Sequence, residues 1–144
     1  MKFFITGSKR GLGYALKEKY GNTESLDECD IFINCKHDGF LQVELLYEAA
    51  SKNKRIINIG SVGSDWINGY KKFYKYGIEK KVLKDANEQL FYDGINTTII
   101  NFGFLDTESV SHIKRPKIDL DYAVSIIDWI IFQPYKIKEI SITP

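Results

Sequence analysis

Short apolar runs alternate along this chain with longer segments whose apolar residues recur at helical spacing, and no other feature constrains the fold as strongly. The alternation predicts βαβ units and a mostly parallel sheet. Near-continuous apolar runs such as 31–33 fit a sheet that is covered on both faces. The predicted strands are residues 2–6, 30–35, 55–59, 95–102 and 138–143. The predicted helices are residues 12–20, 40–52, 73–92 and 120–132.

The size and composition suit one soluble domain over residues 1–144. Apolar residues make up 44% of the chain and charged residues 27%, and the net charge of +1 gives no pull toward nucleic acid or an anionic membrane. No apolar run is long enough for a membrane span or a signal peptide, so we expect a cytoplasmic protein. Cys29 and Cys35 are expected to be reduced thiols, with Cys35 a small buried group.

A glycine-rich turn joins the first predicted strand to the first predicted helix, where residues 6–13 read T-G-S-K-R-G-L-G. Glycines allow a tight turn and let a pyrophosphate approach the backbone, and the N–H groups at the helix start favour negative charge. This context predicts dinucleotide binding. The alternative is an ordinary strand-to-helix turn that uses glycine for close packing. The segment is not a P-loop, because no Gly-Lys-Ser/Thr ends it.

The turn resembles the cofactor turn of short-chain dehydrogenases, T-G-x-x-x-G-x-G, at each of its fixed positions. In relatives that use NADP, a basic residue before the second glycine often contacts the 2′-phosphate. Arg10 stands there beside Lys9, and a guanidinium suits phosphate because its donors form a planar fork. The alternative for Arg10 is a solvated loop residue. The resemblance implies NADP(H) as preferred cofactor, with NAD(H) possible. It implies as cofactor-binding residues Gly7, Ser8, Lys9, Arg10, Gly11, Leu12, Gly13, Asn34, Tyr76, Lys80, Gly103 and Thr107.

A serine, a tyrosine and a lysine follow in the order that the same family uses at its catalytic site. Ser61 follows the third predicted strand, and Tyr76 and Lys80 stand at i and i+4 on the next predicted helix, so both point from one face. Relatives usually place the tyrosine two positions nearer to the serine. Tyr74 has that spacing but lacks a lysine four residues on, so Tyr76 is preferred with a two-residue insertion in the loop. Ser64 is a lesser candidate for the serine.

The expected chemistry is proton transfer to or from a substrate oxygen. A tyrosine pKa that falls from about 10 toward 7 requires roughly 4 kcal/mol. One ammonium about 4 Å away contributes roughly that much at an effective dielectric of 20. Lys80, helped by an oxidised nicotinamide, would therefore lower the pKa of Tyr76, and Ser61 would orient the substrate oxygen. The alternative is a helix with a solvated lysine face and packing aromatics.

Two later segments extend the resemblance. Residues 101–107 resemble the N-x-x-P-G-x-x-x-T loop beside the nicotinamide, which implies roles for Gly103 and Thr107. Phe102 replaces the usual proline, and Thr107 is alternatively a helix N-cap. Asn34 matches the first asparagine of the family's N-N-A-G motif, whereas His37 is expected to be a surface or loop residue. No metal site is predicted.

The largest departure is a missing stretch between Tyr20 and Asp30, which leaves no room for two βα units that relatives carry there. The sheet should therefore keep family strands 1-4-5-6-7 and lose the edge that normally cradles adenine and its ribose. Asp27 and Glu28 are weak substitutes for the usual acidic residue. The shortened helix 40–52 contains Gln42 but no counterpart of the family's asparagine.

Together these patterns predict an α/β chain, a single Rossmann-like three-layer domain with a shortened, mostly parallel sheet of about five strands. The resemblance implies an NADP(H)-preferring oxidoreductase that interconverts a carbonyl and an alcohol at Ser61, Tyr76 and Lys80. A small-molecule substrate and a homo-oligomer, dimer or tetramer, are expected as partners, without nucleic acid or membrane. The alternatives are a non-catalytic dinucleotide-binding or regulatory protein, and an interaction module that pairs through an exposed first strand.

Overall fold

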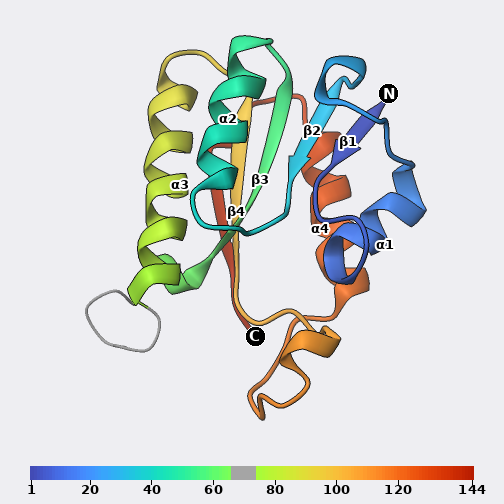
Figure 1. Cartoon of the computed structure of the whole chain (residues 1–144), viewed down its shortest axis with the longest axis vertical. Helices are drawn as coiled ribbons and strands as arrows, with labels where there is room; N and C mark the ends of the chain where they lie inside the picture. Colours follow the sequence, from blue (N-terminus) through green and yellow to red (C-terminus); the bar gives the residue numbers. More distant parts are fainter. Residues whose placement is uncertain (66–73) are drawn as a thin grey trace.

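The computed structural model describes residues 1–65 and 74–144, which form a sheet of five parallel strands between two layers of helices (Figure 1). The sheet has the order β1-β2-β3-β4-β5. Its strands are β1 (Phe3–Ile5), β2 (Ile31–Asn34), β3 (Arg55–Ser61), β4 (Thr97–Phe102) and β5 (Glu139–Ile142). The helices are α1 (Gly11–Tyr20), α2 (Leu41–Ser51), α3 (Tyr74–Tyr92) and α4 (Leu120–Ile131). The predicted α/β Rossmann-like architecture is confirmed; Phe73, the predicted helix start, lies outside the described residues.

The two faces of the sheet are covered by different helix pairs. α1 and α4 pack on one face, and α2 and α3 on the other. Alternate side chains of each strand serve the two layers. In β2, Ile31 and Ile33 join the core under α1 and α4, whereas Phe32 between them packs toward α2 and α3. No helix in the described part of the chain is long and apolar enough to cross a membrane.

Within the described residues the sheet ends at β1, which pairs only with β2. The predicted loss of the two outer strands is therefore confirmed. The free edge predicted from that loss is wrong, because the segment after α1 closes it. The Asn22 side chain accepts a hydrogen bond from the Ile5 N–H (2.9 Å) and donates one to the Ile5 carbonyl (3.1 Å). The Thr23 N–H donates to the Phe3 carbonyl (2.8 Å).

The shortening also changes the handedness of one crossover connection between parallel strands. The connections through α1 and α2 both move the chain one strand further in the same direction, yet the two helices cover opposite faces. The two crossovers therefore have opposite hands, although about 98% of parallel crossovers are right-handed. In the usual dinucleotide-binding order 3-2-1-4, the first helix leads to a strand on the far side of strand 1. Here the same helix leads directly to the strand on the near side.

Candidate active site

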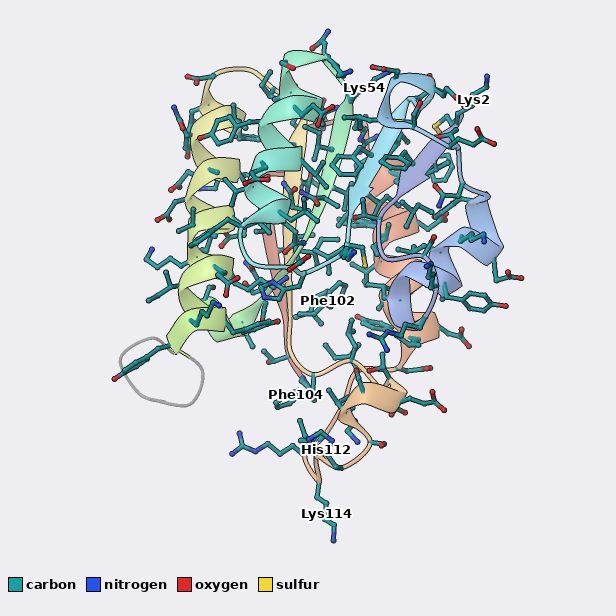
Figure 2. All side chains as sticks on the ribbon, viewed as in Figure 1. Lys2, Lys54, Phe102, Phe104, His112 and Lys114 are labelled. Carbon is teal, nitrogen blue, oxygen red and sulfur yellow. The ribbon has the colours of Figure 1, made fainter. Side chains whose placement is uncertain are left out.

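A cavity of about 490 Å³ opens at the carboxyl ends of the strands, within the range of about 300–1,000 Å³ usual for small-molecule sites. Figure 2 shows Phe102 and Phe104 at this end, near the loop that carries His112 and Lys114, whereas Lys2 and Lys54 lie at the opposite end. Most of the cavity wall is apolar. It is lined by Leu12, Cys35, His37, Ile59, Gly60, Ser61, Val62, Gly63, Tyr76, Lys80, Phe102, Gly103, Phe104, Leu105, Thr107, Val110 and Ile113.

Ser61 and Tyr76 meet in this cavity. Ser61 is the last residue of β3, and Tyr76 lies in the first turn of α3. Gly63 sits against both: its N–H donates to Ser61 Oγ (3.0 Å), and a Cβ built on it would lie 3.3 Å from Tyr76 Cε1. The Tyr76 and Ser61 side chains both line the cavity. The alternatives Tyr74 and Ser64 are not among the described residues that line the cavity.

Lys80 shares the cavity, and its ammonium is hydrogen-bonded to α2 and β3. Lys80 Nζ donates to Gln42 Oε1 (2.8 Å) and to the Ile59 carbonyl (3.1 Å), and it lies 5.6 Å from the centroid of the Tyr76 ring. The side chain is 4% exposed, and burial lowers the pKa of Lys80 to about 8. With a pKa of about 8, Lys80 is mostly protonated at neutral pH, closer to losing its proton than an exposed lysine.

The pKa of Tyr76 moves opposite to the expectation from sequence. Desolvation of the phenol within the cavity raises the pKa of Tyr76, although the residue as a whole is 37% exposed, and the Ser61 side chain opposes that rise. Lys80 is not among the groups that shift the pKa of Tyr76, so the expected lowering is not found in the protein without its cofactor. The protonated phenol is the favoured form at neutral pH, which suits donation of a proton.

Gln42 is a site residue that sequence reasoning did not assign. It lies in the first turn of α2, is 3% exposed, and donates from Nε2 to the Asn34 carbonyl (2.8 Å) and the Ile59 carbonyl (3.0 Å). These two bonds fix the amide, so that its oxygen faces Lys80. The available signal was a lone amide on the otherwise apolar, buried face of the predicted helix.

A buried polar network continues from Gln42 beneath α2 and α3. Asn34 Nδ2 donates to the Gln42 carbonyl (2.7 Å) and to Asn58 Oδ1 (2.9 Å), and Asn58 Nδ2 donates to Asn87 Oδ1 (3.0 Å). Thr97 Oγ1 also donates to Asn87 Oδ1 (2.7 Å). Asn34, predicted to bind the cofactor, is thus fully buried and does not line the cavity. Its side chain joins β2 to β3 and α2.

The glycine-rich turn has the tight geometry that its sequence requires. Gly7 and Gly11 have φ values of 69° and 60°, which side chains rarely adopt. A Cβ on Gly13 would lie 2.1 Å from the Gly7 carbonyl oxygen, so this glycine serves close packing, as the alternative interpretation held. Thr6 Oγ1 accepts hydrogen bonds from the N–H groups of Cys35 (2.9 Å) and Lys36 (3.1 Å), which tie the turn to the loop after β2.

The remaining predicted cofactor residues surround this turn. Lys9 and Arg10 are exposed, and Arg10 occupies the N-cap position of α1 without a side-chain cap. Leu12 lines the cavity, as do Gly103 and Thr107 from the loop after β4. The Thr107 methyl group lies 3.5 Å from where a Gly11 Cβ would stand, so the loop reaches the turn.

Thr107 also stands at the N-cap position of the short 3-10 helix Glu108–Val110. Its hydroxyl does not cap that helix, since it is hydrogen-bonded to Ser109 Oγ (3.0 Å). The N-cap interpretation is therefore right about the position of Thr107 and wrong about its bond.

The substitutes suggested for the family's acidic residue are misplaced. Asp27 forms an ion pair with Lys52, just after the end of α2, and Glu28 is in the same short 3-10 helix. That helix precedes β2, so it lies at the amino ends of the strands, away from the glycine turn. The residue that does lie beside the turn is Asn22, whose Nδ2 is 3.2 Å from Ser8 Oγ.

His37 was expected in a surface loop. It lies in the loop after β2, but its ring also lines the cavity and contacts the ring of Tyr76 at a centroid distance of 4.7 Å. Both cysteines are free; Cys35 lines the cavity, and burial raises the pKa of its thiol to about 11. The insertion predicted between Ser61 and Tyr76 falls on 66–73, outside the described residues.

Comparison with known proteins identifies the fold. No family model and no curated protein matches the chain by sequence. Among solved structures, a short-chain dehydrogenase from Burkholderia cenocepacia in complex with NADP matches with a TM-score of 0.73 and 15% identity, over 99% of this chain and 90% of that chain. A 3-alpha-hydroxysteroid dehydrogenase from Pseudomonas complexed with NADH matches with a TM-score of 0.70 and 12% identity, over 99% and 95%.

Serine dehydrogenase from Escherichia coli is a third such structure, with a TM-score of 0.71 and 15% identity, over 99% of this chain and 97% of that chain. The matched regions extend over nearly the whole of both chains, and the strand order agrees with a sheet shortened beyond β1. The chain therefore has the Rossmann fold of short-chain dehydrogenases in a shortened form.

Proposed function

We propose that this protein is an NADP(H)-preferring oxidoreductase that interconverts a carbonyl and an alcohol by hydride transfer. The observation that carries the proposal is the convergence of Ser61, Tyr76 and Lys80 in one cavity next to the glycine-rich turn. These residues come from β3 and α3, and apolar walls surround them. Structural likeness to dehydrogenases that bind NADP or NADH supports the same class of reaction.

The residues present fit a nicotinamide dinucleotide. Gly7 and Gly11 carry no side chain where a pyrophosphate would approach the start of α1. Leu12, Gly103 and Thr107 line the wall of the cavity next to the turn, where they would hold the nicotinamide ring. The cofactor supplies or accepts the hydride when bound. The protein supplies orientation, exclusion of water and a proton.

Three side chains would handle the reacting oxygen. The Ser61 hydroxyl donates a hydrogen bond that orients it. Tyr76 gives its phenolic proton to that oxygen during reduction and takes it back during oxidation. Lys80, held by Gln42, places a positive charge in the pocket that stabilises the tyrosinate left behind. Lys80 would also donate a hydrogen bond from its ammonium to the cofactor ribose, in addition to its bond to Gln42.

The preference for NADP(H) is proposed from charge. Lys9 and Arg10 are exposed at the start of α1, on the flank of the turn. A 2′-phosphate would find paired donors there, and no described carboxylate forms an ion pair with either side chain.

The first test is a calorimetric titration with NADPH and NADH, on the wild type and on Arg10→Ala. Losing a hydrogen-bonded charge pair of about 1.5–3 kcal/mol should weaken NADPH binding roughly 10- to 150-fold and leave NADH binding nearly unchanged. Lys17→Ala, on the exposed side of the same helix, is the matched control. Equal binding of both nucleotides by Arg10→Ala and wild type would reject the NADP preference. Failure of both nucleotides to bind would reject the oxidoreductase.

The second test is turnover of NADPH with a panel of aldehydes and ketones. Tyr76→Phe should lower the rate by about 10²–10⁴-fold, the usual contribution of a general acid. Tyr74→Phe is the control, since Tyr74 lies two residues away on the same helix, 42% exposed. A Tyr76→Phe variant that turns over as fast as Tyr74→Phe would remove Tyr76 from the mechanism.

A non-catalytic dinucleotide-binding protein is the second candidate, and one observation favours it. The edge that would extend toward adenine is closed by Asn22 and Thr23, so the chain has less surface for the cofactor than a full-length dehydrogenase fold. Nucleotide binding without turnover on the whole panel would favour this candidate.

We also propose a homo-oligomer, from exposed apolar residues on α3. Ile78 is 44% exposed and Val82 is 37% exposed, one turn apart on that helix. Sedimentation of the wild type and of an Ile78→Lys variant tests this. A wild type that sediments as a monomer contradicts it.

A further inference from the structure

Next to the Ser61, Tyr76 and Lys80 cluster lies a second pair of titratable side chains that the proposed mechanism does not use. Glu79 follows Tyr76 by three positions on α3, and His37 comes from the loop after β2. His37 Nε2 lies 3.6 Å from Glu79 Oε2. The imidazole also contacts the Tyr76 ring, with the ring planes 60° apart. The pair therefore connects the β2 loop to the helix that carries the site.

Glu79 is an unusual residue to find in this place. Its side chain is 5% exposed, and Oε2 has no hydrogen-bond partner among the described residues. A buried carboxylate without partners is costly, so His37 is the group that compensates its charge. Gly39, with a φ of 55°, packs over the same oxygen, since a Cβ there would lie 3.7 Å away. The loop is thus folded around the carboxylate.

His37 and Lys80 share two neighbouring groups, Glu79 and Gln42. Burial and the Lys80 ammonium lower the pKa of His37, whereas Glu79 and Gln42 raise it. Glu79 Oε2 lies 3.6 Å from His37 Nε2, and Gln42 Oε1 accepts from Lys80 Nζ (2.8 Å). A proton gained by His37 therefore adds a positive charge next to the Glu79 carboxylate and near the Lys80 ammonium.

We propose that His37 and Glu79 are positioning residues for Tyr76 and Lys80: Glu79 fixes the imidazole against the Tyr76 ring, so that protonation of His37 changes the surroundings of the Tyr76 phenol and the Lys80 ammonium. The role of the pair in catalysis rests on the proposed function, whereas the contacts between His37, Glu79 and Tyr76 are independent of it. It assigns to the site a pH-sensitive group that is separate from the residues that touch the substrate oxygen.

The charged groups around His37 set the sign of the test. Burial and the Lys80 ammonium lower the pKa of His37, whereas Glu79, the hydrogen bond to Gln42 and Asp38 raise it. Removing the Glu79 charge must therefore lower the pKa of His37 further. An opposite charge at this range is worth about one pH unit or more.

The experiment is a pH titration by NMR that needs neither substrate nor turnover. The chain has 2 histidines, so the second, His112, is an internal reference. Tyrosine labelled with ¹³C at Cζ reports on Tyr76, assigned by the loss of its signal in Tyr76→Phe. In the wild type, the Tyr76 signal should show a step at the midpoint of His37. Glu79→Gln should move the His37 midpoint and that step together to lower pH by about one unit.

Matched variants separate positioning from a merely structural role. His37→Gln should abolish the step at the His37 midpoint in the Tyr76 signal, whereas His112→Gln should leave it intact. Asp85→Asn, which removes an exposed carboxylate from the same helix, should leave the His37 midpoint unchanged. If Glu79→Gln does not fold, loss of the step in His37→Gln, against its persistence in His112→Gln, carries the test.

A Tyr76 signal without the step, or an unmoved His37 midpoint in Glu79→Gln, would overturn the inference. If the wild type neither binds nucleotide nor turns over a substrate, yet the Tyr76 step and the lowered His37 midpoint in Glu79→Gln are both observed, the proposed function is overturned. The His37–Glu79 coupling would then still stand.

Discussion

The cavity end of the site and the glycine-turn end are built in different ways. At the cavity end, Lys80 and Gln42 are nearly fully buried, and their hydrogen bonds pass to the backbone of β2 and β3. At the turn end, Lys9 and Arg10 are exposed, and one side chain, that of Asn22, closes the sheet. One end is fixed by a connected set of buried polar groups, and the other by backbone conformation and a single amide.

This difference explains which half of the fold tolerates shortening. A buried ammonium needs each of its partners, because any missing acceptor costs the desolvation of the group. A glycine turn at a helix start binds phosphate through backbone N–H groups, which do not depend on strands further out. The chain therefore loses strands beyond β1 while keeping the network that holds Lys80. The comparison predicts large effects where packing is tight and smaller effects at the closed edge.

The largest loss of stability is expected from Gly13→Ala, because the backbone of the glycine-rich turn packs directly against this residue. The new methyl group would lie 2.1 Å from the Gly7 carbonyl oxygen, and backbone cannot move aside as a side chain can. Overpacking of this kind should cost about 3 kcal/mol or more of unfolding free energy, measured by urea denaturation. Nucleotide binding should be lost with it.

Tyr14→Ala, at the next position and 49% exposed, is the control for that substitution and should change stability by less than about 0.5–1 kcal/mol. A Gly13→Ala protein as stable as Tyr14→Ala would mean that the turn adapts. The contrast between a rigid backbone turn and the buried polar network would then fail.

The cavity end is tested by pH, through the burial of Lys80. Its pKa is 10.5 in the unfolded chain and about 8 in the folded protein. Between these values the unfolded state binds more protons, so stability rises as the pH increases from about 8 to 10.5, and is low below pH 8, where the lysine is charged in both states. The difference in unfolding free energy between wild type and Lys80→Met should therefore increase by about 3 kcal/mol from pH 7 to pH 11.

Urea denaturation at both pH values measures that difference, and circular dichroism confirms that each variant is folded. Lys81→Met, on the exposed side of the same helix, serves as control and should not reproduce the increase. A pH-independent difference for Lys80→Met would show that Lys80 is hydrated in solution, and that the cavity end is as open as the turn end.

Much of this arrangement is predictable from the sequence, for identifiable reasons. Strand and helix periodicity placed the nine elements, and i, i+4 spacing with the end of β3 brought Tyr76, Lys80 and Ser61 into one cavity. These inferences depend on local periodicity and on the rule that parallel strands end at one edge. Both hold regardless of which side chains pack between the elements.

The contacts that cross between elements were not predictable in the same way. Gln42 and Glu79 stand on two different helices, and nothing local predicts that the Gln42 amide oxygen accepts from Lys80 or that Glu79 lies against His37. Asn34 matched a cofactor motif by sequence, yet its side chain lies beneath α2. Such errors come from side-chain direction, which depends on how tightly two elements approach.

The smallest effect is expected at the closed edge, from Asn22. Asn22→Ala removes the acceptor of the Ile5 N–H and the donor to the Ile5 carbonyl, at about 1 kcal/mol for each bond. Asn22→Asp keeps the acceptor and loses the donor, so its loss of unfolding free energy should be about half that of Asn22→Ala. If both variants are as stable as the wild type, the amide does not hold the edge. β1 would then be as open to pairing with another chain in the wild type as in Asn22→Ala, and cross-linking should detect the same dimers in both.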